Sequence, residues 1–318
     1  MICSCKISSE VPVSTFARPS RVRARMPETS VIIRAYNEAT YIGEVLSALD
    51  EQSYSNFEII LIDSGSTDGT LQIADSYVDR VVHVPPDEFS FGHACNVGCE
   101  KSRGEYCAFI SAHAIPADEY WLEPLVKHIR DPNVAMCYGK QVGTGPTPFS
   151  EARLLHRLFP ANSRKQEPPD YWANNASSVI KKSLWRRRGF DGELTGHEDV
   201  DWAKYFMEQG YAVMYESSSC IHHIHDEDWD QIFNRYEREA IADAKIGVRS
   251  MGDRWVEYMS IPTDILSDIF AGIRLGDLNR QMLDEIIRYR YNQHMGAASG
   301  LMKQKEVSEV REKYYFDT

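Results

Sequence analysis

The feature that most constrains the fold is a pair of apolar segments separated by a helical stripe. Residues 30–36 (SVIIRAY) and 57–63 (FEIILID) have the length and composition of strands. The second is apolar on both faces, as expected of a strand between two helix layers of a parallel sheet. Between them four apolar residues recur at helical spacing: Ile42, Val45, Leu46 and Leu49. Alternation of strand and helix predicts right-handed βαβ units and an α/β fold.

The alternation continues along the chain. We expect further strands at 80–84, 106–111, 134–140, 176–181 and 212–216, and helices around 71–78, 93–102, 122–129 and after 198. Residues 143–169 are rich in Gly, Pro and polar side chains and predict a long loop with a short helix near 151–159.

The pattern predicts three segments. Residues 1–29 form a basic, disordered arm, residues 30–225 an α/β domain, and residues 226–318 a helical C-terminal region. The chain as a whole has 35 Lys and Arg against 47 Asp and Glu, a net charge of −12. This balance argues against nucleic-acid binding over a broad basic surface. It also implies that any anionic ligand is handled by few groups.

The cysteines and the hydropathy pattern indicate where such a chain would work. Seven scattered cysteines without a C-x-x-C pair predict reduced thiols in a cytoplasmic protein. No stretch has the roughly 18–20 uncharged apolar residues that a membrane span needs. We therefore expect a cytoplasmic protein, with contact to the inner face of a membrane left open.

Unusual polar residues lie at the carboxyl ends of three predicted strands. They are Arg34 and Glu38 at the end of the first, Asp63 at the end of the second, and Ser111 and His113 at the end of the fourth. In open α/β sheets ligands bind at the carboxyl ends of strands, so these residues are candidates for a site. Two later groups join them: Gly196-His197-Glu198-Asp199 at a helix start, and the histidines around His223 and His225.

Taken in order, RAYNE, EIILIDSGSTDGT and GHEDVDW over residues 30–225 resemble the family 2 glycosyltransferases, which have the GT-A fold. FSFGHACNVG, SAHAIP and YGKQ are more similar to the rhamnosyltransferase-like branch that builds bacterial surface polysaccharides. The resemblance implies an α/β GT-A sheet, mostly parallel and flanked by helices, and a nucleoside-diphosphate sugar as donor.

In the resembled family the acid at Asp63 contacts the nucleobase. A carboxylate there could accept a hydrogen bond from N3–H of uracil or thymine, or from N1–H of guanine. The alternative is that Asp63 and Asp68 only form turns or cap the next helix. Arg34 and Glu38 could hold the ribose or base, or serve the local structure alone.

The fourth strand departs from the family pattern. The family usually has D-x-D, two carboxylates that bind Mg²⁺ or Mn²⁺ at the diphosphate, and this chain has Ser111-Ala112-His113. Imidazole suits Mn²⁺ or a similar borderline metal better than Mg²⁺. We expect a divalent cation on His113 with His223 and His225, which share a face of an extended segment. Direct contact of His113 with the diphosphate, without a metal, is the alternative.

An acidic pair at Glu198-Asp199 matches the point where the family has its catalytic base. Asp199 is the candidate base and Glu198 would orient or cap, although Thr195-x-x-Glu198 also fits a capping box. Trp172, Asn174 and Asn175 lie where the family lines its acceptor side. The basic run 181–188 is either a solvated helix face or a contact for a phosphorylated acceptor or an anionic membrane.

The sequence therefore predicts an inverting glycosyltransferase that moves a sugar from a UDP-, dTDP- or GDP-linked donor to a hydroxyl of a glycan or lipid-linked acceptor, in polysaccharide biosynthesis. Peripheral membrane contact and a homo-oligomer stay open. One alternative is a non-catalytic protein that kept the fold after losing D-x-D. A nucleotidyltransferase is disfavoured, because RAYNEATY is not the Gly-rich, basic loop such enzymes need.

Overall fold

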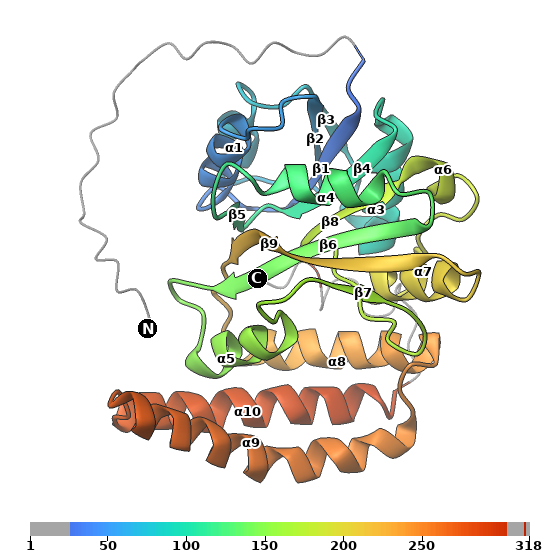
Figure 1. Cartoon of the computed structure of the whole chain (residues 1–318). Helices are drawn as coiled ribbons and strands as arrows, with labels where there is room; N and C mark the ends of the chain where they lie inside the picture. Colours follow the sequence, from blue (N-terminus) through green and yellow to red (C-terminus); the bar gives the residue numbers. More distant parts are fainter. Residues whose placement is uncertain (1–25, 304–314, 316–318) are drawn as a thin grey trace, which may run out of the picture.

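The computed structural model describes residues 26–303 and residue 315. In this part of the chain nine strands form one sheet in the order β3-β2-β1-β4-β8-β6-β9-β5, with β7 paired to the outside of β9 (Figure 1). The strands are β1 Thr29–Ala35, β2 Phe57–Asp63, β3 Arg80–His83, β4 Tyr106–Ser111, β5 Ala114–Pro116, β6 Val134–Gly143, β7 Arg164–Gln166, β8 Ser177–Lys181 and β9 Ala212–His223.

Helices cover both faces of the sheet and add a layer at the C-terminal end (Figure 1). They are α1 Ile42–Asp50, α2 Thr70–Ala74, α3 Phe91–Lys101, α4 Leu122–Ile129, α5 Phe149–Leu158, α6 Lys182–Trp185, α7 Glu198–Met207, α8 Trp229–Ile246, α9 Arg254–Leu275 and α10 Arg280–Gly300, with 3-10 turns at Pro86–Glu88 and Met251–Asp253. The expected α/β fold with a helical C-terminal region is confirmed.

Strands β3, β2, β1 and β4 are parallel, so their carboxyl ends lie along one edge of the sheet. Alternate side chains of β1 and β2 enter opposite cores: Ile32 and Ile60 pack with α3 and α7, whereas Val31 and Ile59 pack with α1 and α4. Burial on both faces explains why these strands are apolar throughout.

The second half of the sheet changes direction. β8 is antiparallel to both β4 and β6, while β6 and β9 are parallel. β9 extends to His223, beyond the expected end at 216, because the ladder with β6 resumes after a register shift at Gly139/Lys140. The three-residue strands β5 and β7 are absent from the sequence expectations, since so short a segment carries no periodic pattern.

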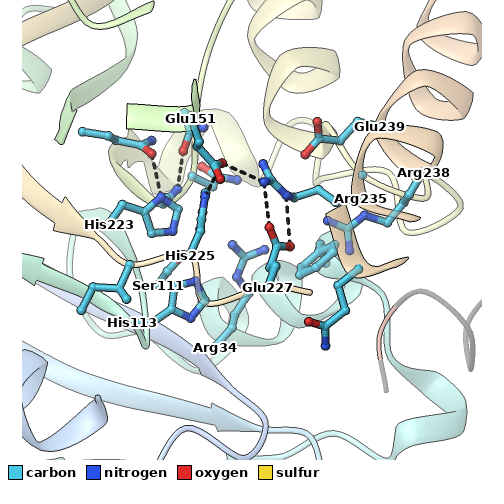
Figure 2. Close-up of a pocket in the computed structure, with 18 of the residues that line it drawn as sticks. Arg34, Ser111, His113, Glu151, His223, His225, Glu227, Arg235, Arg238 and Glu239 are labelled. Carbon is cyan, nitrogen blue, oxygen red and sulfur yellow. Dashed lines mark hydrogen bonds and ion pairs between the residues drawn. The ribbon is translucent and has the colours of Figure 1, made fainter. Parts of the chain in front are cut away.

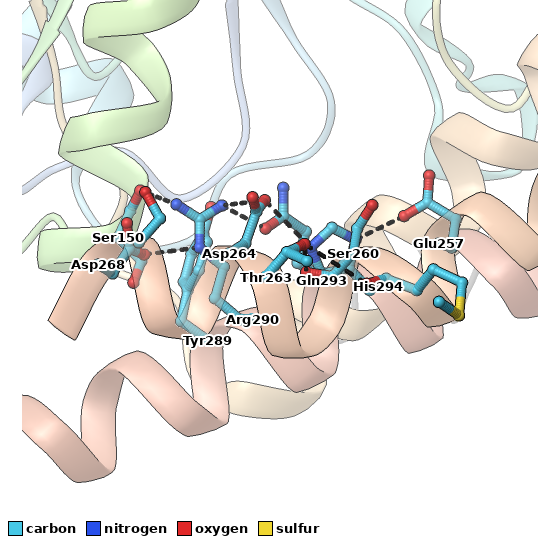
Figure 3. A network of polar contacts seen from close by, with 12 residues as sticks. Ser150, Glu257, Ser260, Thr263, Asp264, Asp268, Tyr289, Arg290, Gln293 and His294 are labelled. Atoms are coloured by element: carbon cyan, nitrogen blue, oxygen red, sulfur yellow. Dashed lines mark hydrogen bonds and ion pairs between the residues drawn. The ribbon is translucent and has the colours of Figure 1, made fainter. Parts of the chain in front are cut away.

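The C-terminal helices are joined to the sheet domain by buried charges (Figure 3). Arg290 of α10 is fully buried; it donates to Asp268 of α9 over 2.7 Å and to the backbone oxygen of Ser150 in α5 over 3.1 Å. His294 donates to Glu257 of α9 over 2.6 Å. A guanidinium on α10 with partners on α9 and α5 fixes the relative positions of the three helices, because breaking such a buried pair is costly.

The segment boundaries differ from the sequence expectations in detail. Residues 1–25 of the expected 1–29 arm lie outside the described residues, whereas Glu28 pairs with Arg130 and Thr29 begins β1. The expected boundary at 225/226 falls in the link between β9 and α8, although α8 contributes side chains to the pocket described below. Among the described helices, none combines the length and apolarity needed to span a membrane.

Candidate active site

A cavity of about 570 Å³ opens at the carboxyl edge of β1 and β4, between the sheet, α5 and α8 (Figure 2). Of the site residues expected from the sequence, all line this cavity except Asp63. Those that do are Arg34, Glu38, Ser111, His113, Trp172, Asn174, Asn175, Glu198, Asp199, His223 and His225. The structure therefore gathers residues that are spread over almost 200 positions of the chain.

The loops after β1 and β2 are tied to each other. Asp68 accepts the backbone N–H of Ala39 over 2.9 Å, and Asn37, in the left-handed region at φ 54°, accepts the N–H of Thr67 over 2.9 Å. The N–H of Glu38 donates to Thr70 over 2.8 Å. These bonds fix the loop that presents Glu38 to the cavity.

Asp63 lies beneath this loop pair and is 1% exposed. Its carboxylate accepts the N–H groups of Gly65 over 3.1 Å and Ser66 over 3.2 Å, and contacts His83 Nδ1 at 3.1 Å. The turn interaction that the sequence left as an alternative is thus formed. Contact of Asp63 with a nucleobase stays a prediction.

Glu198 is held by two partners at the start of α7. Arg34 donates to its Oε1 over 3.1 Å and the side chain of Asn175 donates to the same atom over 3.3 Å. Arg34 itself stacks over the ring of Phe91, 5.0 Å from the centroid. Arg34 and Asn175 therefore orient Glu198. The orienting or capping role expected of Glu198 itself stays a prediction.

Asp199 follows directly and is 7% exposed. Its two oxygens accept the N–H groups of Asn175 over 2.6 Å and Val200 over 2.8 Å. Burial and the negative charge of Glu198 raise the pKa of Asp199 to about 7, outweighing these hydrogen bonds and nearby His197. A carboxylate with a pKa near neutrality can accept a proton and release it again at physiological pH.

His197 precedes this acidic pair and has a left-handed backbone, φ 53°. Its Nδ1 donates to Asp243 of α8 over 2.6 Å. Burial disfavours a charge here, but Asp243 and Glu239 raise the pKa of His197 to about 10. His197 is thus a cation at neutral pH that links α7 to α8.

The expected acceptor-side residues differ in what they do. Asn175 is buried and serves Glu198 and Asp199. Asn174 accepts the N–H of Ala176 over 2.7 Å. Trp172 lines the cavity beside His197, with its indole edge toward the imidazole at 6.1 Å between centroids. Of the three, Trp172 offers the broadest surface to a sugar.

His113, His223 and His225 lie next to one another in the cavity (Figure 2). The rings of His113 and His223 stack at 5.1 Å, and those of His223 and His225 meet edge to face at 4.2 Å. One ring nitrogen of each lies within 4.8 Å of the other two, close to the span of two metal–nitrogen bonds. The expected grouping of His113 with His223 and His225 is therefore present.

Two of these histidines have pKa values shifted in opposite directions, because their charged neighbours differ. Burial and the neighbouring imidazoles hold the pKa of His223 well below its usual value. For His113 burial acts in the same direction, but the charge of Glu38 raises the pKa above the usual value. His223 is thus neutral at physiological pH, which is the form that binds metals.

Residues from α5 and α8 complete the cavity, and the sequence analysis did not propose them. Glu151 of α5 accepts from Arg235 Nη2 over 2.7 Å and from His225 Nδ1 over 2.6 Å. Burial alone would favour the neutral acid, yet Arg235 and His225 hold the pKa of Glu151 down at about 2. A polar stripe on α8 could have indicated this face: Gln231, Asn234, Arg235 and Arg238, spaced i, i+3, i+4, i+7.

The basic run 181–188 is largely engaged by the protein itself. Lys182 donates to the backbone oxygen of Ser102, and Arg188 pairs with Asp201 at 2.6 Å. Arg187 donates to Gln209 over 2.8 Å. Of the run's cations, Arg186 and Arg187 are exposed. This arrangement favours the structural interpretation of the run over a broad anion-binding surface.

Comparison with known proteins places this architecture among sugar-transferring enzymes. The family model described as glycosyl transferase family 2 matches residues 30–194. Glycosyltransferase AglE of Haloferax volcanii is 28% identical over 197 residues, covering 60% of this chain and 64% of AglE. The O-antigen chain rhamnosyltransferase WbaN of Salmonella anatum is 24% identical, covering 66% of this chain and 70% of WbaN.

Solved structures share the fold at low sequence identity. Mannosyltransferase PcManGT from Pyrobaculum calidifontis, in complex with GDP-Man and Mn²⁺, has a TM-score of 0.60 and 18% identity, covering 91% of this chain and 92% of its own. TarS of S. aureus in complex with UDP-GlcNAc has a TM-score of 0.51 and 17% identity, covering 84% of this chain and 90% of that one.

Proposed function

The chain belongs to glycosyl transferase family 2, and from this premise we propose that it is an inverting glycosyltransferase. The donor is a nucleoside-diphosphate sugar, with UDP, dTDP or GDP as the nucleotide, and the acceptor is a hydroxyl group of a glycan or a lipid-linked glycan. The observation that carries the proposal is Asp199, a buried carboxylate with a pKa of about 7 that lines the same cavity as the histidines.

Asp199 supplies the base that such a reaction needs. An inverting transfer requires a group that takes the acceptor's proton as the hydroxyl oxygen attacks the anomeric carbon and the nucleoside diphosphate departs. Asn175 and Val200 fix both oxygens of Asp199 by backbone hydrogen bonds. The carboxylate is therefore oriented before the substrates arrive, which lowers the entropic cost of reaching the transition state.

Arg34 and Glu198 support this base without replacing it. The ion pair between them, at 3.1 Å, uses the guanidinium that would otherwise be available to Asp199. The negative charge of Glu198 beside Asp199 raises the pKa of the base. We assign Glu198 and Arg34 the role of tuning and orienting Asp199, and Glu38, Ser111 and Asp63 the donor side.

The residues present fit a divalent cation. His113, His223 and His225 offer three converging nitrogens, and the buried Nε2 of His223 has no hydrogen-bond partner in the part of the chain that the structure describes. An unpartnered buried nitrogen is costly unless a ligand satisfies it. When bound, a cation there would neutralise charge on the departing diphosphate. PcManGT, cited above, was solved with Mn²⁺.

The acceptor follows from the relatives and from the chemistry of the cavity. WbaN carries the name of an O-antigen chain rhamnosyltransferase, which supports a role for this chain in polysaccharide assembly. We propose that this role is in the cytoplasm. Trp172 lines the same cavity as Asp199, and aromatic surfaces suit the apolar faces of sugars. We place the acceptor sugar on the Trp172 side.

A panel of UDP-, dTDP- and GDP-sugars tests the proposal. One nucleotide class should raise the melting temperature of the full chain, because a ligand that binds the native state stabilises it. With that class the protein should release the nucleoside diphosphate, slowly with water and faster with a glycan acceptor. Failure of every donor to bind and to be cleaved would favour a non-catalytic protein of this fold.

A further inference from the structure

Each of the three cavity histidines has its Nδ1 held by a different oxygen. Glu38 Oε1 lies 2.8 Å from Nδ1 of His113, Gln141 Oε1 lies 2.7 Å from Nδ1 of His223, and Glu151 Oε1 lies 2.6 Å from Nδ1 of His225. The three acceptors come from separate places: the loop after β1, strand β6 and helix α5. Figure 2 shows the three rings side by side with Glu151 above His225.

This arrangement determines which nitrogen each ring offers. A carboxylate or amide oxygen accepts a hydrogen bond, so the proton of the neutral imidazole resides on Nδ1 and the lone pair on Nε2. On His223 the free Nε2 is buried and has no partner among the described residues. Three oxygens thus leave three Nε2 lone pairs available on neighbouring rings.

From this geometry we infer that the cavity binds a borderline first-row transition cation on three imidazole nitrogens, and that Glu38, Gln141 and Glu151 are positioning residues that prepare those nitrogens. Metal-bound histidines usually donate their second ring N–H to an oxygen in this way. Imidazole suits Zn²⁺, Co²⁺ and, more weakly, Mn²⁺, whereas Mg²⁺ prefers oxygen ligands. The inference deepens the proposed function by specifying its cation.

Variants of Gln141 can test whether an acceptor acts by positioning its histidine ring or only by its negative charge. It is 2% exposed and carries no charge, and its contact with His223 is made on β6, opposite the loop that carries Glu38. Replacing Gln141 with Glu keeps an oxygen at this place, whereas Leu of similar size removes it. If the acceptor positions the ring, the first variant should bind metal and the second should bind it poorly.

The experiment titrates the full-length chain, stripped with a chelator, with Co²⁺ alone and follows the visible absorption of the bound ion. We expect one equivalent to bind with visible bands, Zn²⁺ to displace it, and millimolar Mg²⁺ to leave it in place. Gln141→Leu should weaken Co²⁺ binding by about 10–100-fold and Gln141→Glu should restore it. His223→Ala should abolish the visible bands.

His128→Ala is the matched control, because His128 pairs with Glu216 at 2.8 Å and is not among the residues that line the cavity. It should bind Co²⁺ like the wild type. Circular dichroism and melting temperature confirm that each variant is folded. Displacement by Mg²⁺, unchanged binding in Gln141→Leu or His223→Ala, or an ultraviolet band from cobalt–thiolate bonds would each overturn the inference.

The assay needs neither donor nor acceptor. A protein that binds Co²⁺ as described but cleaves no nucleotide sugar would contradict the proposed function and leave the cation site standing. A protein that cleaves a donor, binds no Co²⁺ and keeps its activity with a chelator would contradict the cation site and leave the proposed function standing.

Discussion

Two carboxylates of the same cavity are almost equally buried and have opposite acidities. Asp199 is 7% exposed with a pKa of about 7, and Glu151 is 1% exposed with a pKa of about 2. Burial favours the neutral acid in both. The difference comes from their neighbours, since Glu151 lies between Arg235 and His225 whereas Asp199 lies beside Glu198.

The comparison shows how the protein keeps a base reactive in an acidic chain. Within residues 26–303 no Lys or Arg side chain forms an ion pair with Asp199, because Arg34 is paired with Glu198. Glu151 pairs with Arg235 and with His225, and it is fixed as an anion that anchors both side chains. One carboxylate is thus suited to proton transfer and the other to structure.

The largest effect is expected for Asp199→Asn. The amide cannot take a proton from the acceptor, so transfer should fall by about 10²- to 10⁴-fold. The donor should raise the melting temperature as it does in the wild type, because Asp199 is assigned to the acceptor side. Asp201→Asn, on the same helix turn and paired with Arg188 at 2.6 Å, is the control and should retain activity. Transfer within a few-fold of wild type in Asp199→Asn would refute its role.

Glu151→Gln should affect stability more than chemistry, because the amide still offers an oxygen to His225. Loss of the charge leaves Arg235 with Glu227 alone, and breaking a buried pair typically costs about 3–5 kcal/mol. We expect a loss at the lower end, about 3 kcal/mol, in urea unfolding at pH 7. Glu167→Gln removes an exposed pair with Lys165 and should leave the free energy of unfolding almost unchanged. If both variants lose the same free energy of unfolding, burial does not decide how much these two ion pairs contribute to stability.

Much of the fold is predictable from the sequence because the first half has strands that are apolar on both faces. The stripe Ile42, Val45, Leu46 and Leu49 is buried as expected. β5 is too short for any periodic signal, and β9 runs through the polar residues Ser217–Ser219, which hide its length. Long apolar elements are therefore recognised, and short or polar ones are fixed by ladder partners far along the chain.

Part of the candidate site was likewise predictable from the sequence. Polar residues at strand ends identify Arg34 and His113, because parallel strands bring their carboxyl ends together. Glu151 and Arg235 face the same cavity through α5 and α8, and packing of those helices against the sheet domain decides this. The oxygen of Gln141 that holds His223 is likewise visible only in three dimensions.

The pH dependence of transfer tests the central claim, that Asp199 accepts a proton near neutrality. Ionised Asp199 is the active form, so its raised pKa predicts that kcat/KM, at saturating metal, falls about tenfold per pH unit below pH 7. The raised pKa values of His197, about 10, and of the buried Cys95 thiol keep these neighbours from titrating in that range. Glu198→Gln removes the neighbouring charge and should move this limb toward lower pH. A wild-type rate that stays flat from pH 8 to pH 5, or an unmoved limb in Glu198→Gln, would contradict the claim.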